Sequence, residues 1–336
     1  MQTLFIGDLS HNNGPANVNK QLVINSNFYE WDTKNKNNIY KPFKLIGYLL
    51  KSKVLIFSGN YRRNYYIFRI AKILRKKCIY LMHSYSMFDS KINNITSKNT
   101  FKQEKVIFTK VDLILTVSEL YKNLLLKEKP DLKNKIHYLN SGFDIDNYKN
   151  VIRNEEKDKS KVIVCGGNRI IKHNSIVSKA ITQLNEEGFK CHLEIFGLNY
   201  DNNEVIKSNE FVKIHGCVPY DKLLKEMSSS NLFVVNSQYE SFGLSVIDAL
   251  MSGCNVLICK NAGINSIIKV NKSDIIDNYN DIEELKRKIK YNMLNNNNSR
   301  IVKSLDIDHY SWKNVSKRLE LIADRIANNK DVKDIN

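Results

Sequence analysis

The feature that most constrains this chain is the alternation of short apolar runs with segments whose apolar residues recur at helical spacing. Runs of Val, Ile and Leu are typical of strands buried on both faces of a parallel sheet. The segments between them predict helices, for example Glu119–Lys127, Ser175–Glu187 and Tyr220–Ser228. This alternation predicts an α/β fold with doubly wound sheets covered by helices. The expected strands are Thr3–Ile6, Leu22–Asn25, Val54–Phe57, Cys78–Met82, Leu113–Val117, Ile136–Leu139, Val162–Cys165, His192–Phe196, Val212–Ile214, Leu232–Val235 and Val256–Ile258.

The alternation breaks at Asn147–Lys161, where NYKNVIRNEEKDKSK is polar and charged and has no periodic apolar face. We expect an interdomain linker there, because 336 residues are too many for one compact core. Two Rossmann-like domains are therefore predicted, one over residues 1–155 and one over residues 156–308.

The end of the chain predicts one more helix at 309–328, with its apolar set spread over Ser311–Asn328. This helix is expected either to pack on its own domain or to cross back over the first. Asn329–Asn336 is predicted to be a disordered tail, and Asn295–Asn298 a polar loop.

The charge is unusual, because 52 Lys and Arg against 35 Asp and Glu leave a formal charge of +17. Such a surplus favours a polyanionic partner, which can be nucleic acid, an anionic membrane or a phosphorylated substrate. A general bias of the chain toward Lys, Asn and Ile is the alternative explanation. The sequence alone leaves both open.

Neither a membrane span nor a secretion signal is visible. No apolar run reaches the length of about 20 residues that a bilayer requires, and MQTLFIGDL lacks the basic start of a signal peptide. The cysteines are scattered without a CxxC pair, so we interpret them as reduced core thiols of a cytoplasmic protein. They are Cys78, Cys165, Cys191, Cys217, Cys254 and Cys259.

The segment Ser237–Gly253, SQYESFGLSVIDALMSG, holds the most informative polar residues. A strand is expected to end near Asn236 and a helix to begin near Gly243. The backbone N–H groups at such a helix start favour an anion such as phosphate. Glu240 is then placed to accept hydrogen bonds from sugar hydroxyls, and Asp248 from those of a ribose. The alternative is that these acids are a helix cap and a solvated helix residue.

The stretch ESFGLSVIDALMSGCNVL resembles the donor-site signature of retaining glycosyltransferases of family four, which have the GT-B fold. That signature has an acid, Phe-Gly, and a second acid eight positions after the first. The second acid here is Asp248 where the family usually has Glu, a side chain shorter by about 1.5 Å. The resemblance implies donor contacts at Glu240, Ser241, Phe242, Gly243, Leu244 and Asp248.

Two further loops match the family in the expected order. Val164–Asn174, VCGGNRIIKHN, resembles a strand–Gly–Arg…Lys loop, which implies that Arg169 and Lys172 clamp the donor diphosphate. Fixed cations there stabilise the charge that the leaving group gains as the glycosidic bond breaks. The loops Phe196-Gly197 and His215-Gly216-Cys217-Val218 resemble those near the nucleotide base, so Cys217 and Val218 are also expected to contact the donor.

In the first half, Gly14-Pro15-Ala16 resembles a small-residue loop that approaches the donor phosphates. His83 follows the strand Cys78–Met82, where the family places a His beside the transferred sugar. The carboxyl end of a strand is a common place for such residues in doubly wound folds. Tyr310-Ser311-Trp312 resembles the start of the family's last helix, which crosses back to the first domain.

Two Asp-x-Asp patterns, Asp144-Ile145-Asp146 and Asp306-Ile307-Asp308, are of the kind that GT-A glycosyltransferases use to hold a divalent ion. So short a pattern occurs often by chance. We therefore expect no metal ion at either pattern, and the family resemblance likewise implies a metal-independent reaction without a cofactor.

The segment Tyr61–Lys77, YRRNYYIFRIAKILRKK, mixes aromatic and aliphatic residues with seven cations, and Pro42–Lys51 adds a shorter basic amphipathic stretch. As helices they suit an anionic membrane surface. The alternative is a helix that packs on its sheet and exposes a solvated basic face.

Taken together, these patterns and the resemblance predict a GT-B glycosyltransferase with its active site in a cleft between two domains. The resemblance implies a UDP- or GDP-sugar donor, retention of anomeric configuration, and roles for Glu240, His83, Arg169 and Lys172 in catalysis. We expect a lipid-linked saccharide acceptor on a polyprenyl pyrophosphate, as in capsule or O-antigen assembly. The alternatives are a sugar-nucleotide epimerase or phosphorylase of similar fold, and a basic nucleic-acid-binding protein, which is disfavoured because no binding module is recognisable.

Overall fold

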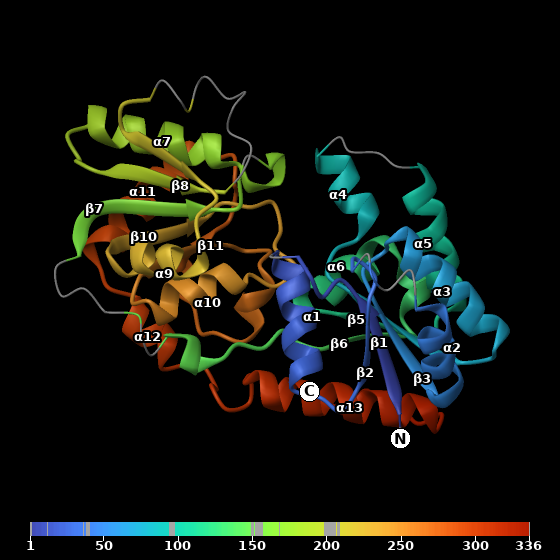
Figure 1. Cartoon of the computed structure of the whole chain (residues 1–336). Coiled ribbons are helices and arrows are strands. Elements are labelled where there is room, and N and C mark those ends of the chain that lie inside the picture. The colour runs from blue at the N-terminus through green and yellow to red at the C-terminus, as the bar shows by residue number, and fades with distance from the viewer. Residues whose placement is uncertain are drawn as a thin grey trace. The chain divides into compact units, whose positions relative to one another are not determined.

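The computed structural model describes residues 2–11, 13–35, 37, 41–93, 98–148, 151, 157–167, 169–197, 206 and 209–335. The chain forms two compact units (Figure 1), one of Met1–Phe143 with Ile307–Asn336 and one of Asp144–Asp306. The division after Phe143 lies earlier than the boundary predicted near residue 155. Much of the predicted linker, residues 149–150 and 152–156, lies outside the described residues.

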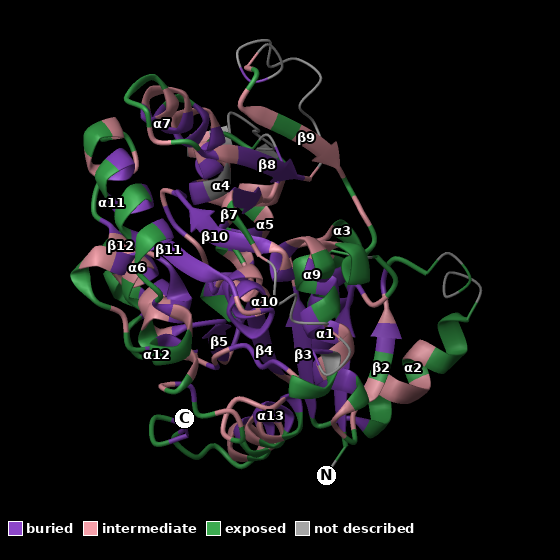
Figure 2. Ribbon diagram, turned by 90° about the vertical axis from the view of Figure 1, so that its left-hand side faces the viewer, coloured by how far each residue is buried: buried purple, intermediate pink, exposed green. Residues whose placement is uncertain are grey.

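The first unit is built on a parallel sheet with the strand order β2-β1-β3-β4-β5-β6. The register places Leu4 beside Leu55 and Leu55 beside Cys78, so the apolar runs of the central strands lie next to one another. Helices cover both faces, and these central strands are buried throughout (Figure 2). The strands are β1 (Thr3–Gly7), β2 (Tyr29–Asp32), β3 (Val54–Ser58), β4 (Lys77–Met82), β5 (Leu113–Thr116) and β6 (Ile136–Tyr138).

The helices of the first unit connect these strands, apart from one that comes from the end of the chain. They are α1 (Gly14–Ile24), α2 (Pro42–Lys51), α3 (Arg62–Ile73), α4 (Ser86–Asn93), α5 (Lys98–Lys110), α6 (Glu119–Glu128) and α13 (Trp312–Ala327), with a 3-10 turn at Pro130–Leu132.

The prediction of a strand at Leu22–Asn25 is wrong, because Leu22 belongs to the last turns of α1. The Oδ1 atom of Asn13 accepts a hydrogen bond from the N–H of Ala16 at 3.0 Å and so caps the start of this helix. The helix buries Leu22 and Val23 on the same side as Ala16 and Val18. The strand of this region is β2, which the apolar pattern missed because it alternates polar and apolar residues.

The last helix, α13, packs on α1 and on strands β3 and β4 of the first unit (Figure 1). Ser311 caps it by accepting a hydrogen bond from the N–H of Asn314 at 3.3 Å. Trp312 at its first turn lies against Gly142, where a Cβ atom would come within 2.8 Å of the indole ring. Any larger residue at position 142 would therefore displace the start of the helix.

The prediction of a disordered tail is wrong for the described residues 329–335. Val332 and Ile335 are 6% and 4% exposed. The carbonyl oxygen of Ile335 lies 2.9 Å from Nε2 of His137, a hydrogen bond that the ring nitrogen donates. Val332 and Ile335 thus belong to the core of the first unit, while the described residues around them are exposed.

The second unit has a parallel sheet with the strand order β12-β11-β10-β7-β8-β9. The described helices around it are α7 (Asn174–Glu186), α9 (Tyr220–Ser228), α10 (Leu244–Met251), α11 (Ile282–Leu294) and α12 (Asn298–Val302), with 3-10 turns at Ile145–Tyr148, Ile170–Lys172, Gly263–Ser266 and Lys272–Asp274. The strands are β7 (Asp158–Cys165), β8 (His192–Phe196), β9 (Val212–Gly216), β10 (Ser230–Val235), β11 (Asn255–Cys259) and β12 (Ile275–Ile276).

The core of the second unit lies between this sheet and helices α7 and α11. Val162, Leu193 and Leu232 from three strands are fully buried against Ile181 of α7 and Leu285 of α11. Asp281 caps α11 by accepting a hydrogen bond from the N–H of Glu284 at 2.9 Å. The continuous apolar runs of β10 and β11 thus form the buried strands that the sequence predicts.

The asparagine run is not simply a polar loop, since Asn297 is only 4% exposed. Its Nδ2 donates to the carbonyl of Val256 at 2.8 Å and to Oδ1 of Asp274 at 2.9 Å. Its Oδ1 accepts from the N–H of Val256 at 3.0 Å. The amide side chain therefore makes the hydrogen bonds to the Val256 backbone in β11 that a neighbouring strand would make.

Four of the cysteines are buried as predicted, but Cys217 is exposed and Cys165 is partly buried. Within the described ranges, none of the helices combines the length and the hydropathy of a membrane-spanning segment.

Candidate functional site

The strand order of the second sheet reverses between β7 and β10. The chain passes from β7 to β8 and β9 on one side and then returns to β10 on the other side of β7. In doubly wound sheets, ligands bind outside the carboxyl ends of the strands at such a point. The loops that follow β7 and β10 carry Lys172 and Glu240, so the topology brings these two residues together.

Lys172 and Glu240 form an ion pair at this point, with Nζ donating to Oε1. The hydroxyl of Ser237 donates to the same carboxylate oxygen at 2.8 Å. Both charged side chains are largely buried, at 10% and 17% exposed. Burial alone would raise the pKa of Glu240, but the charge and hydrogen bond of Lys172 hold it below its ordinary value. The acid is therefore a carboxylate at neutral pH, with lone pairs available to a hydroxyl donor.

The loop after β7 depends on glycine. Gly166 has φ of 109°, and a Cβ atom there would come within 2.7 Å of Cε of Lys172. The same loop carries Arg169, which is exposed and whose Nε donates to the carbonyl of Gly166 at 3.2 Å. The charge of Arg169 also helps to lower the pKa of Glu240. Two cations thus lie on one short loop beside one carboxylate.

The helix start predicted near Gly243 is confirmed, since α10 begins at Leu244 with Gly243 as its N-cap at φ of 108°. The loop before it is braced by the segment after β11. The N–H of Gly263 donates to the carbonyl of Glu240 at 3.0 Å, and that of Ile264 donates to the carbonyl of Phe242 at 2.7 Å. Phe242 is buried, whereas Ser241 and Leu244 are partly buried. These bonds hold the backbone before α10 in one conformation.

Asp248 is partly buried and accepts hydrogen bonds from two tyrosines. The hydroxyls of Tyr148 and Tyr220 each lie 2.7 Å from its Oδ1 atom. Burial raises the pKa of Asp248 to about 6, although both hydrogen bonds oppose this shift. Sequence reasoning missed both tyrosines, because Tyr148 lies in the segment predicted as linker and Tyr220 begins α9.

Cys217 and Val218 lie in the loop between β9 and α9. Cys217 is exposed and Val218 partly buried. The loop leads to Tyr220, whose side chain remains 48% exposed while its hydroxyl reaches Asp248. The structure thus connects the predicted base loop to the predicted ribose acid through one tyrosine.

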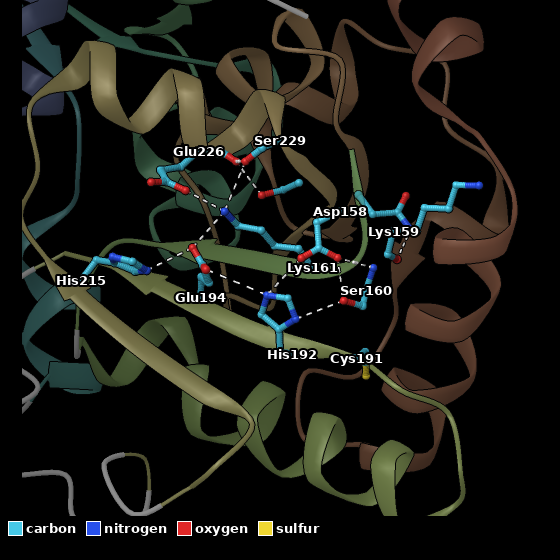
Figure 3. Close-up of polar contacts among 12 residues, drawn as sticks. Asp158, Lys159, Ser160, Lys161, Cys191, His192, Glu194, His215, Glu226 and Ser229 are labelled. Carbon is cyan, nitrogen blue, oxygen red and sulfur yellow. Dashed lines mark hydrogen bonds and ion pairs between the residues drawn. The ribbon is translucent and has the colours of Figure 1, made fainter. Parts of the chain in front are cut away.

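A second polar cluster, which the sequence did not predict, crosses the sheet from β7 to β9 (Figure 3). Lys161 is 6% exposed, and its Nζ lies 2.6 Å from Oε2 of Glu226 and 3.0 Å from Oε2 of Glu194. Burial would lower the pKa of Lys161, but these two acids hold it above its ordinary value. The cluster joins β7, β8 and α9 through a cation buried between two carboxylates.

His215 extends this cluster toward the base loop (Figure 3). Its Nε2 lies 3.0 Å from Oε2 of Glu194, close enough for an ion pair but not aligned as a hydrogen bond. Its ring stacks on Phe196 with centroids 4.4 Å apart. The end of β9, just before Cys217, is therefore held by a stack and by a charged partner.

In the first unit the strand order reverses between β1 and β3, and polar residues meet at their carboxyl ends. Nδ2 of Asn19 donates to the carbonyl of Asp8 at 3.0 Å, and the hydroxyl of Ser58 donates to Oδ1 of Asn19 at 2.6 Å. His83, after β4, places Nε2 at 3.0 Å from Oγ of Ser58 and 3.1 Å from Oδ1 of Asn19. Gly14 is the first residue of the neighbouring α1.

His83 is held as a neutral ring. Burial lowers its pKa to about 4. The amide orientation of Asn19 follows from its bond to Asp8, so Oδ1 faces the ring as an acceptor. This favours the tautomer with the proton on Nε2 and leaves Nδ1 as the acceptor. The position at a strand end was predicted, but its partners Asn19 and Ser58 were not.

The predicted site residues thus fall into two groups. Arg169, Lys172, Glu240, Gly243 and Asp248 lie with Cys217, Val218, Ser241, Phe242 and Leu244 in the second unit, whereas Gly14 and His83 belong to the first. Among the residues that the structure describes, no group of three His, Cys, Asp or Glu side chains is arranged to hold a metal ion.

The second unit coincides with a known family. Residues 144–304 match glycosyl transferases group 1. An uncharacterized glycosyltransferase of Methanocaldococcus jannaschii is 24% identical over 287 residues, which are 78% of this chain and 72% of that protein. Both findings are similarities to glycosyltransferases, and the match to group 1 covers the second unit.

The whole fold also has close counterparts. Sucrose-phosphate synthase from Thermosynechococcus elongatus matches with a TM-score of 0.74 at 12% identity, covering 98% of this chain and 100% of that one. Anabaena HepE in complex with UDP-glucose matches with a TM-score of 0.69 at 14% identity, covering 96% of this chain and 99% of that one. The fold is therefore the two-domain α/β fold of GT-B glycosyltransferases, as predicted.

Proposed function

We propose that the protein transfers a sugar from a nucleotide-sugar donor, with retention of anomeric configuration and without a metal ion. The observation that carries this proposal is the Lys172–Glu240 pair at the reversal point of the second sheet. The pair places a carboxylate that can bind sugar hydroxyls beside cations that can bind phosphate, at one edge of the second sheet. The match to glycosyl transferases group 1 and the UDP-glucose bound by HepE support the same donor class.

Each residue has a part that follows from its chemistry. Arg169 is exposed and always charged, so it is suited to pair with the diphosphate oxygens. Lys172 and the N-terminus of α10 add positive potential where the leaving group gains charge. Glu240 orients the sugar through its hydroxyls. Ribose hydroxyls donate hydrogen bonds to Asp248, either in addition to those from Tyr148 and Tyr220 or in their place.

In the proposed step, the bond from the anomeric carbon to the diphosphate oxygen breaks, and a bond to an acceptor oxygen forms on the same face. The acceptor proton passes to the departing phosphate, so no protein nucleophile is required. Charge stabilisation of the leaving group by fixed cations is then the main contribution of the chain. The contact of His83 with the transferred sugar, which the family resemblance implies, stays a prediction.

We further propose that the first unit binds a saccharide carried on a polyprenyl pyrophosphate, in capsule or O-antigen assembly at the inner face of the cell membrane. The net charge of +17 is compatible with a phosphorylated acceptor and an anionic surface. Exposed cations of the first unit, such as Lys41, Lys44 and Lys51, support this choice.

Thermal unfolding with a panel of UDP-, GDP-, ADP- and CMP-sugars in EDTA tests the proposal. A ligand that binds only the folded chain raises its midpoint, so one nucleotide class is expected to give a shift. Arg169→Ala should weaken the binding of that donor at least tenfold with only a small change in the midpoint of the free chain, because the side chain is exposed. Lys317→Ala, an exposed cation on α13, is the matched control. No shift with any member of the panel overturns the proposal.

A further inference from the structure

Helix α2 leaves three large apolar side chains on the surface of the first unit. Phe43, Ile46 and Leu50 are 86%, 50% and 62% exposed, whereas Leu49 is buried. Positions i, i+3 and i+7 lie on one face of a helix, so these three side chains form one stripe. Figure 2 shows the same helix in the colours of exposed and intermediate residues. The stripe faces solvent, where it gains nothing from the hydrophobic effect.

Exposed cations border this stripe. Lys41, Lys44 and Lys51 are exposed at the start, on the flank and at the end of α2. Residues 33–88 as a whole contain thirteen Lys and Arg and no Asp or Glu. We call Lys41, Phe43, Lys44, Ile46, Leu50 and Lys51 the α2 surface. Its positive field is unopposed in the sequence around it and attracts an anionic partner.

The same combination continues at the end of α3. Ile73 is 77% exposed, and Arg75, two residues later, is also exposed. Nζ of Lys76 donates to the carbonyls of Leu50 at 3.0 Å and Ser52 at 2.8 Å. These bonds hold the end of α3 next to the end of α2, so apolar and basic side chains of two helices lie in the same region.

The chemistry of the α2 surface selects among anionic partners. Nucleic acid would engage the lysines through phosphates, but it has no apolar interior that a whole stripe of Phe43, Ile46 and Leu50 could enter. A bilayer offers both, because anionic headgroups meet the cations while apolar side chains enter the acyl boundary. We propose that the α2 surface docks the protein on an anionic phospholipid bilayer. This proposal deepens the proposed use of a lipid-linked acceptor. It rests on that proposed function only for the reason why the protein would dock, since docking itself requires no sugar.

Vesicle sedimentation with the full chain tests the docking. The chain is expected to bind vesicles of phosphatidylglycerol and phosphatidylcholine at least tenfold more tightly than vesicles of phosphatidylcholine alone, and less tightly as salt increases. The triple variant Phe43→Ser, Ile46→Ser and Leu50→Ser should lose at least tenfold in affinity. The control Leu294→Ser with Leu321→Ser removes side chains that are 68% and 45% exposed elsewhere, and should bind like the parent chain.

A second pair of variants tests whether vesicle binding depends on the position of the cations or only on the total charge. Lys44→Gln with Lys51→Gln should weaken binding to the anionic vesicles by roughly 25-fold, since each cation near the membrane surface contributes roughly fivefold. Lys313→Gln with Lys317→Gln removes two exposed cations of α13 and should weaken it less than threefold. Equal losses from both pairs would overturn the assignment to α2.

Other outcomes also decide the question. The proposal is overturned if the parent chain does not bind anionic vesicles, or if the triple variant binds them as tightly as the parent. Retention on heparin without vesicle binding would overturn it in favour of nucleic acid. Donor-induced thermal shifts, measured on the same variants, separate this result from the proposed function. Vesicle binding without any donor shift leaves the docking surface standing and removes the transferase proposal.

Discussion

Nζ of Lys172 donates a hydrogen bond to Oε1 of Glu240, two residues that are 68 positions apart in the sequence. The pair exists because β7 and β10 are neighbours at the reversal point of the second sheet. The charge of each side chain is compensated by the other inside the protein. The carboxylate therefore stays ionised in a largely buried place, which is the state that a hydroxyl donor requires.

Removing one member of this pair should destabilise the chain more than removing both charges. Lys172→Met leaves Glu240 as a largely buried carboxylate without its ion-pair partner, with an expected loss of about 3–5 kcal/mol in the free energy of unfolding. The double variant Lys172→Met and Glu240→Gln should recover most of that loss, yet bind no donor. Urea unfolding and donor-induced thermal shifts measure the two effects. Additive losses in the double variant would contradict the ion pair.

Asp248 should make the chain less stable as the pH rises. Its pKa is raised to about 6 by burial, against an ordinary value of 3.8, so the folded chain holds the proton more tightly than the unfolded chain. This contribution is complete below about pH 3.8 and is lost as the pH rises through about 6, and it amounts to about 3 kcal/mol at most. Asp248→Asn does not titrate, so its stability relative to the parent should increase from pH 4 to pH 7. A difference that is constant with pH, measured by urea unfolding, would contradict this.

His83 should make the chain less stable as the pH falls, the opposite of the effect of Asp248. Its pKa is lowered from 6.5 to about 4 by burial, so the unfolded chain binds the proton more readily. The stabilising contribution is present above about pH 6.5 and is lost as the pH falls through about 4, which again amounts to about 3 kcal/mol at most. His83→Gln keeps a donor for Asn19 without titrating. The parent should therefore lose stability relative to this variant on acidification, measured by urea unfolding. A difference in unfolding free energy that does not change with pH would show that the ring is not buried as a neutral group.

Lys161 should matter far more than an exposed lysine in a similar pair. Lys161→Met leaves Glu194 and Glu226 without their shared cation, and a loss of about 3 kcal/mol in the free energy of unfolding is expected. Lys333 pairs with Asp331 at 3.5 Å with both side chains mostly exposed, so Lys333→Met should change stability by less than about 0.5 kcal/mol. Equal effects in denaturant unfolding would mean that the cluster of Figure 3 is solvated.

The end of the chain should contribute to the stability of the first unit. Removing residues 331–336 takes away the buried side chains of Val332 and Ile335 and the acceptor of His137, which predicts a loss of about 2–4 kcal/mol. The double variant Val332→Ala and Ile335→Ala should reproduce most of it. Lys333→Ala, at an exposed position in the same segment, is the control. An unchanged thermal midpoint after truncation would return these residues to the disordered tail predicted from sequence.

Some features of this protein follow from the sequence by itself. Strongly apolar strands such as Val54–Ser58 and Leu232–Val235 were predictable, because a strand buried on both faces leaves a continuous apolar run. The start of α10 near Gly243 was predictable for a local reason, since a glycine stands before a helical pattern, and the structure gives this glycine the positive φ that it tolerates. Glu240 and Lys172 were identified by their loops and by family resemblance.

Tertiary structure alone decided the partners of these residues. Strand order, which no local pattern encodes, places Lys172 against Glu240 and Ser58 beside His83. Tyr148 and Tyr220 reach Asp248 from segments that are 100 and 28 positions away in the sequence. The tail predicted after Asn328 failed for this reason, because a distant histidine holds it. The strand predicted at Leu22 failed for a local reason, because the cap at Asn13 starts a helix that runs through Leu22. Local propensity specifies which elements form, whereas burial, pairing and pKa depend on contacts that only the folded chain creates.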